Sequence, residues 1–179
     1  MRLITTGTAW PTTQAAAIRP SGQGIAFVQS GANWVADSDV FTTLTEIKNG
    51  SGVRTGWKYV NELDETENYD ANGRLLNIVN KAGLTTTLGY DARGNLTTVT
   101  DPFGHQLTIA YGSGSQAQSL TDPAGQSYQF SYDTYNNLRS ITFPGPHVKQ
   151  FLYNESGLIV AGSLLHALTG IIDENGNRF

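Results

Sequence analysis

The chain has 179 residues, of which 39% are hydrophobic and only 15% charged, with a formal net charge of −4 at pH 7. This length favours one domain with a real core, and the acidic balance argues against a nucleic-acid-binding surface. The absence of cysteine excludes disulfides, thiolate metal sites and a thiol nucleophile. The sequence has no signal peptide and no apolar run near the roughly 20 residues of a membrane span. We therefore expect a soluble chain.

Residues 1–68 are expected to form an irregular β lead-in or a cap. The turn patterns Arg19-Pro20-Ser21-Gly22 and Asn49-Gly50-Ser51-Gly52 separate apolar segments that resemble strands. These expected strands are residues 25–28, 40–48 and 53–60. Three aromatic residues are expected in the core: Trp34, Trp57 and Tyr59. The region is either a degenerate stretch of the sheet that follows or a cap that ends it.

Four carboxylates lie close together before residue 68, at Glu62, Asp64, Glu65 and Glu67. Such a group can supply an acid/base pair, but it is more often a solvated turn or a guard on a sheet edge. We predict the second role.

From residue 69 the sequence repeats every 21 residues, so the domain 69–157 is predicted to be a repeat array. The repeat is marked by tyrosines and by two kinds of turn, Asp-x-x-Gly and Asp-Pro-x-Gly, which have the composition of type I turns. The residues that define it are Tyr69, Asp70, Gly73, Tyr90, Asp91, Gly94, Asp101, Pro102, Gly104, Tyr111, Asp122, Pro123, Gly125, Tyr132, Asp133 and Tyr153.

Turns every 10 or 11 residues leave room only for short strands joined as hairpins, so the fold class is all-β, an antiparallel meander. The predicted strands are 74–79, 84–90, 95–100, 105–111, 116–121, 126–132, 137–142 and 147–153. Some apolar residues are three apart, as Leu75 and Ile78 are, and a β-bulge between them would return both to the core.

The repeated tyrosines are predicted to form a ladder on one apolar face of the sheet, because they alternate with polar residues along their strands. Leu107, Ile109 and Tyr111 share this face, whereas Thr108 is on the other. We interpret the ladder as part of the hydrophobic core in preference to a platform that binds a ligand. The sheet must cover this face by coiling, by folding on itself or by packing against another copy.

Residues 158–179 are predicted to be a C-terminal tail. Residues 158–168 have the composition of a strand followed by a short helix, and Asp173-Glu174-Asn175-Gly176 is a further turn.

The motif Tyr-Asp-x-x-Gly-x-Leu, at Tyr69–Leu75 and Tyr90–Leu96, resembles the YD repeat of RHS proteins. The resemblance covers about residues 69–157 and is strengthened by the Asp101-Pro102-Phe103-Gly104 turn in mid-unit. It implies a sheet that spirals into a hollow shell. In bacterial RHS and insecticidal toxin-complex proteins such a shell encloses a toxic domain, and in animal teneurins a related shell supports adhesion. The self-cleavage motif of that family has no match here, so the chain resembles a segment of a shell.

Catalytic chemistry is not expected. The regular aspartates are explained by their turns, and the histidines, His105, His147 and His166, are scattered. The Gly112-Ser113-Gly114-Ser115 stretch has no lysine and no following helix for phosphate binding. Calcium is the one metal considered, on stacked aspartate turns, but each turn offers one carboxylate. We expect no enzyme activity, no cofactor and no metal.

Two functions remain open. The first is a structural segment of a bacterial RHS polymorphic-toxin protein, secreted or at the cell surface, acting as scaffold or shell wall. Its partners would be other YD-repeat sheet segments or further copies, joined through the apolar face or the sheet edges, with a toxin domain as possible cargo. The alternative is a module that binds carbohydrates or cell surfaces through aromatic residues.

Overall fold

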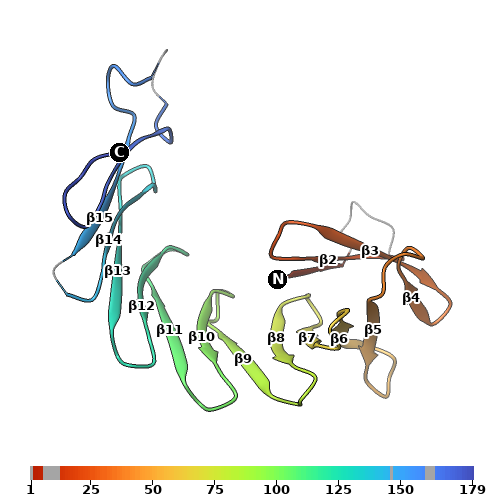
Figure 1. Ribbon diagram of the computed structural model, residues 1–179. Helices are drawn as coiled ribbons and strands as arrows, with labels where there is room; N and C mark the ends of the chain where they lie inside the picture. The colour runs from red at the N-terminus through yellow and green to blue at the C-terminus, as the bar shows by residue number, and fades with distance from the viewer. Residues whose placement is uncertain (1, 6–12, 146, 160–163) are drawn as a thin grey trace. The chain divides into compact units, whose positions relative to one another are not determined.

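Figure 1 shows the computed structural model, which describes residues 2–5, 13–145, 147–159 and 164–179. The regular elements in these ranges are β-strands, which confirms the all-β prediction. The chain divides into two compact units: unit 1 holds residues 1–89 and 99–104, and unit 2 holds residues 90–98 and 105–179. Within each unit the strands pair antiparallel in the order of the chain.

Unit 1 contains the first nine strands, the last of which ends at the boundary of the unit. They are β1 (Arg2–Thr5), β2 (Gln14–Ile18), β3 (Gly24–Ser30), β4 (Asn33–Val35), β5 (Thr43–Lys48), β6 (Arg54–Val60), β7 (Thr66–Asp70), β8 (Leu75–Val79) and β9 (Thr85–Tyr90).

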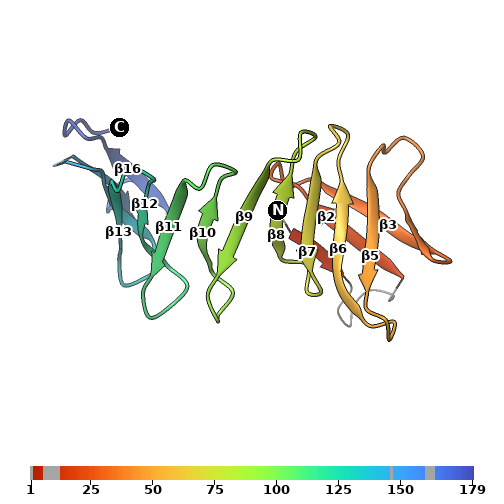
Figure 2. The same cartoon turned by 90° about the horizontal axis from the view of Figure 1, so that it is seen from below.

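Unit 2 contains a second run of antiparallel hairpins, drawn in green to blue in Figure 2. Its strands are β11 (Gln106–Tyr111), β12 (Ala117–Thr121), β13 (Ser127–Tyr132), β14 (Leu138–Thr142), β15 (Val148–Tyr153) and β16 (Leu168–Ile172). The remaining strand, β10 (Leu96–Thr100), contributes residues to both units. From β8 to β15 each strand begins one residue after the predicted start.

The core of unit 1 forms because the sheet turns back on itself. Figure 1 shows β2 and β3 lying opposite β6 and β7, so that the two pairs of strands face each other. The Phe27 ring of β3 packs edge-on against Tyr59 of β6, with ring centroids 6.3 Å apart. Trp34 and Trp57 make a similar contact at 5.0 Å. The N-terminal strands therefore continue the sheet and also cover its apolar face.

The burial predicted for Trp34, Trp57 and Tyr59 is confirmed, since these side chains are 9%, 0% and 1% exposed. Burying an aromatic residue this fully contributes roughly 1.5–3 kcal/mol to stability. Gly56, beside Trp57, has no room for a side chain, because a Cβ atom there would lie 2.5 Å from the Tyr69 carbonyl oxygen. Because Gly56 has no Cβ atom, the main chains of β6 and β7 can approach this closely. Trp57 and Tyr69 then face each other on one side of the pair.

The predicted bulge after Leu75 is confirmed. Asn68 faces Asn77 across the β7–β8 pair, but the next residue, Tyr69, faces Leu75, so Leu76 is the extra residue. The same shift recurs where Tyr111 faces Ala117, where Tyr132 faces Leu138 and where Tyr153 faces Leu168. A bulge therefore accompanies these repeat tyrosines at the end of the strand.

The tail departs from the prediction of a strand followed by a helix. Residues 158, 159 and 164–167 precede β16, and this described part of the segment contains no helix. Residues 160–163 lie outside the described ranges. After β16 the Asp173 turn forms as predicted, and the Ile171 and Phe179 main chains exchange hydrogen bonds of 3.0 and 2.8 Å beyond it.

Candidate functional site

The repeated turns share one hydrogen-bonding design. The first residue of each turn accepts two backbone N–H groups through its Oδ1 atom, from the second and fourth residues after it. For Asp91 the donors are Arg93 at 2.9 Å and Asn95 at 2.8 Å. The turns with this pair of bonds begin at Asn49, Asn61, Asp70, Asn80, Asp91, Asp122, Asp133 and Asp173. Each carboxylate is thus occupied by its own turn.

The fourth residue of each turn takes a left-handed conformation, which explains the repeated glycine. The φ angles are +79° at Gly73, +87° at Gly94, +86° at Gly104 and +78° at Gly125. In the Asp133 turn Asn136 occupies this place at +67°. The second-place prolines, Pro102 and Pro123, are exposed, and Asp101 accepts a hydrogen bond from the Phe103 N–H at 2.8 Å.

Several turns add a bond from a side chain four residues later. Asn95 donates to Asp91 at 2.9 Å and Asn177 donates to Asp173 at 3.1 Å. These amide bonds, followed by the backbone donors, hold the pKa of Asp91 and Asp173 below the usual range of aspartate. A lowered pKa stabilises the folded state above the normal aspartate pKa, and this contribution is lost as the pH falls through the lowered value.

Asp91→Asn is therefore expected to lower stability at neutral pH more than at acid pH, where the carboxylate no longer contributes. Asn80 already fills the same position in another turn and accepts the same two N–H groups, so an amide supports this geometry. We expect a modest loss of stability at pH 7 and little difference from the parent in acid, so that the loss of stability below about pH 4 is shallower. Urea midpoints measured across this pH range test it. An unchanged acid dependence would mean that Asp91 is not ionised preferentially in the folded state.

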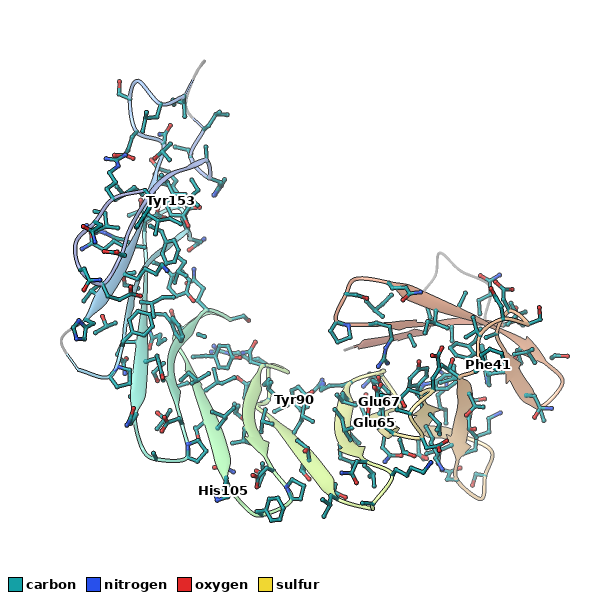
Figure 3. The ribbon with its side chains drawn as sticks, in the orientation of Figure 1. Phe41, Glu65, Glu67, Tyr90, His105 and Tyr153 are labelled. Atoms are coloured by element: carbon teal, nitrogen blue, oxygen red, sulfur yellow. The ribbon has the colours of Figure 1, made fainter. Side chains whose placement is uncertain are left out.

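The repeat tyrosines differ in burial. Tyr69 is 2% exposed, whereas Tyr90, Tyr111, Tyr132 and Tyr153 are half-buried. The hydroxyl groups of Tyr111 and Tyr132 each donate to a backbone carbonyl 15 residues earlier, Leu96 and Ala117, both at 2.9 Å. Each of these two tyrosines therefore ties its strand to the strand before it. Figure 3 labels Tyr90 and Tyr153 on their strands.

Glu67 is the main departure from the sequence analysis. The sequence predicts that it lies in a solvated turn or at a sheet edge, but its side chain is 1% exposed. It lies inside the curl that the sheet of unit 1 forms by turning back on itself (Figure 3). Arg19 binds it with both terminal nitrogens, at 2.7 and 2.9 Å, and the Tyr69 hydroxyl donates to the same carboxylate. The prediction fits Asp64, an exposed residue that pairs with Lys81 at 2.8 Å.

Glu67 is buried because it alternates with Tyr69 on β7. Tyr59 faces Glu67 and Trp57 faces Tyr69 across the β6–β7 pair, so all four share the inner face. The sequence holds this alternation, but not the partner, since Arg19 lies 48 residues earlier. Its guanidinium also lies over the Tyr59 ring, 4.7 Å from the centroid.

The electrostatics of this cluster favour one charge state. The hydrogen bond that Arg19 donates to Glu67 raises the pKa of Arg19 above its usual value. Burial, followed by the bond to Glu67, raises the pKa of Tyr69. Arg19 is therefore a cation and Tyr69 a neutral donor at physiological pH. An adjoining cleft of about 300 Å³ is lined by Arg19, Thr42, Tyr59 and Asn61 among others. Because Glu67 already occupies the guanidinium fork, this arrangement suits locking the sheet rather than binding an anion.

The histidines lie apart from this cluster. His105 is exposed at the end of the β10–β11 hairpin (Figure 3), and His147 is exposed before β15. His166 lies with its Nδ1 2.6 Å from Oδ1 of the buried Asn137. The Asn137 amide donates to Asp133 and to the Leu165 carbonyl, both at 2.8 Å. Because the Asn137 amide nitrogen is the donor in both of these bonds, its Oδ1 atom accepts and His166 Nδ1 donates. This bond fixes the segment before β16 to the preceding hairpin.

The described residues contain no group of three or more histidine, aspartate or glutamate side chains arranged to hold a metal ion. Within the same ranges no helix has the length and apolar character to cross a membrane.

Antiparallel hairpins, a 21-residue period and self-capped turns define a β-hairpin repeat protein. Residues 69–106 match the family model RHS Repeat. They include Tyr69–Leu75 and Tyr90–Leu96, the two motifs that carry the resemblance. The chain thus contains RHS repeats within residues 69–106. No curated protein matches it at a significant level.

Proposed function

We propose that this chain is a non-enzymatic structural segment of an RHS protein, serving as scaffold or shell wall in a bacterial polymorphic-toxin system. RHS repeats occur in bacterial proteins that are secreted or at the cell surface, and residues 69–106 match that repeat. The observation that carries the proposal is how the polar groups are used. The repeated aspartates cap their own turns, and the buried Glu67 is bound by Arg19.

A segment of a shell wall needs surfaces through which it can pack against or pair with further β-sheet. In unit 2 the apolar residues of β11, Leu107, Ile109 and Tyr111, are only half-buried. The partners we propose are other YD-repeat segments or further copies of the chain, joined through this face or through the sheet edges. A toxin domain is the proposed cargo of the complete assembly.

The alternative, carbohydrate binding on aromatic residues, has less support. Stacking on a sugar needs a free ring face. Tyr69 is buried, and the other repeat tyrosines, Tyr90, Tyr111, Tyr132 and Tyr153, are partly buried.

The proposal predicts that the chain associates, which light scattering after size exclusion at several concentrations would test. We expect a mass that rises with concentration, because an uncovered apolar face or sheet edge favours pairing. A mass that stays monomeric at every concentration would contradict the proposal and favour an autonomous binding domain.

Two lysine substitutions on one strand locate the association surface. Ile109→Lys places a charge on the apolar face of β11 and is expected to reduce association. Thr108→Lys places the same charge on the exposed, polar face and is the matched control. Equal effects of the two variants would exclude the apolar face and leave the sheet edges as the contact.

A further inference from the structure

A polar groove crosses the outer side of three strands in unit 2. It has a volume of about 320 Å³ and lies over β13, β14 and β15. Its lining residues are Ser131, Tyr132, Arg139, Ser140, Val148 and Gln150. Three of them form a row across the sheet, because Ser131 faces Ser140 and Ser140 faces Gln150.

Arg139 reaches this groove through a bulge. Ser131 faces Ser140 while Tyr132 faces Leu138, so Arg139 is the extra residue of β14. A bulge re-aims the side chain it carries. Arg139 is exposed, and within the described ranges its guanidinium has no hydrogen bond or ion pair. By contrast, Arg54 and Arg178 each bind a glutamate, at 2.8 and 2.7 Å.

The other polar groups of the groove also include donors. The Ser131 and Ser140 hydroxyl oxygens are 2.7 Å apart, so one hydroxyl donates to the other and the second keeps its proton for a further acceptor. Gln150 is exposed and adds an amide donor. A guanidinium fork beside hydroxyl and amide donors matches the planar geometry of a carboxylate.

From this arrangement we propose that the groove binds an aspartate or glutamate side chain on an acidic segment of a protein partner. The Arg139 guanidinium, with its single charge, matches a carboxylate better than the double charge of a phosphate. The nearest lysine in β15, Lys149, faces Ile141 and alternates with the groove residues Val148 and Gln150. Val148 supplies an apolar contact for the methylene groups of the bound side chain.

A saccharide fits the groove less well. Its one aromatic residue, Tyr132, is half-buried, and its hydroxyl donates to the Ala117 carbonyl. The groove therefore offers a sugar only one partly covered aromatic ring for stacking. The inference is independent of the wall function, since a chain could form a wall without recognising any carboxylate.

The test is an NMR titration of the whole chain with the acetylated, amidated tripeptide Gly-Glu-Gly. We expect shifts at the Arg139 Nε–H and at the Ser131, Ser140 and Gln150 signals. The matching Gly-Gln-Gly peptide should give none, because it lacks the charge. Arg139→Gln should weaken binding at least about tenfold, the usual scale of a charge-assisted hydrogen bond.

The controls separate this site from general charge attraction. Lys149→Gln removes a nearby cation on the other face and should leave binding unchanged. The proposal is wrong if both peptides shift the same signals, if Arg139→Gln binds as well as the parent, or if no shift occurs at the solubility limit. Tighter binding of galacturonate or inorganic phosphate than of the glutamate peptide would also overturn it, in favour of an acidic saccharide or a phosphate.

Discussion

Replacing Glu67 with leucine is expected to lower the free energy of unfolding of unit 1 by about 3–5 kcal/mol. The loss is large because Glu67→Leu leaves the Arg19 guanidinium inside the curl without its acceptor. Both nitrogens of that fork now bind Glu67, at 2.7 and 2.9 Å. The Tyr69 hydroxyl loses its acceptor at the same time. Breaking a buried pair by removing one partner is costlier than replacing both.

Urea unfolding followed by tryptophan fluorescence measures this effect, since Trp34 and Trp57 lie in the same core. The double variant Glu67→Leu with Arg19→Met should recover most of the loss. Lys81→Met, which breaks the exposed pair with Asp64, is the control and should cost about 1 kcal/mol or less. A cost for Glu67→Leu no larger than that of the control would show that the buried pair does not hold the curl closed.

The local structure of the repeat can be predicted from the sequence because its determinants are close together in the chain. The Asp91 turn needs only the carboxylate, two nearby N–H groups and Gly94 with positive φ. Even the bulge after Leu75 is encoded locally, because Leu75 and Ile78 are spaced three apart. Strand bounds, turns and bulges therefore follow from patterns that span about ten residues.

The covering of unit 1 depends on contacts that no short pattern contains. Phe27 meets Tyr59, and Arg19 meets Glu67, only after β2 and β3 have turned back across the sheet. Four carboxylates within six residues look alike in sequence, yet Asp64 is exposed on a turn and Glu67 is buried on a strand. What distinguishes them is the alternation of Glu67 with Tyr69. That signal becomes decisive only when the inner face of β7 is known.

The same limit applies to the candidate groove. Arg139 follows the strand pattern of its repeat, and the sequence offers no sign that it has no acidic partner among the residues that the structure describes. That property depends on which carboxylates are already used by their own turns. Asp133, six residues earlier, is bonded to Tyr135, Asn137 and the Asn137 amide.

Alanine at equivalent tyrosines is expected to have unequal effects, although the repeat places them identically. Tyr69→Ala should destabilise unit 1 by about 3–5 kcal/mol, because the ring is fully enclosed and a cavity remains. Tyr111→Ala should destabilise unit 2 by about 1–2 kcal/mol, because its ring is only partly buried and less burial energy is lost.

Hydrogen exchange measured on peptides from each unit distinguishes the two effects, because each unit then supplies its own reference. Tyr135→Ala is the control, since that ring is 50% exposed on a turn and should cost less than about 0.5 kcal/mol. Equal losses at Tyr69 and Tyr111 would mean that the apolar face of unit 2 is covered in solution as completely as that of unit 1. In that case association through that face would already be present, and Ile109→Lys should lower the protection of Tyr111 and its neighbours together.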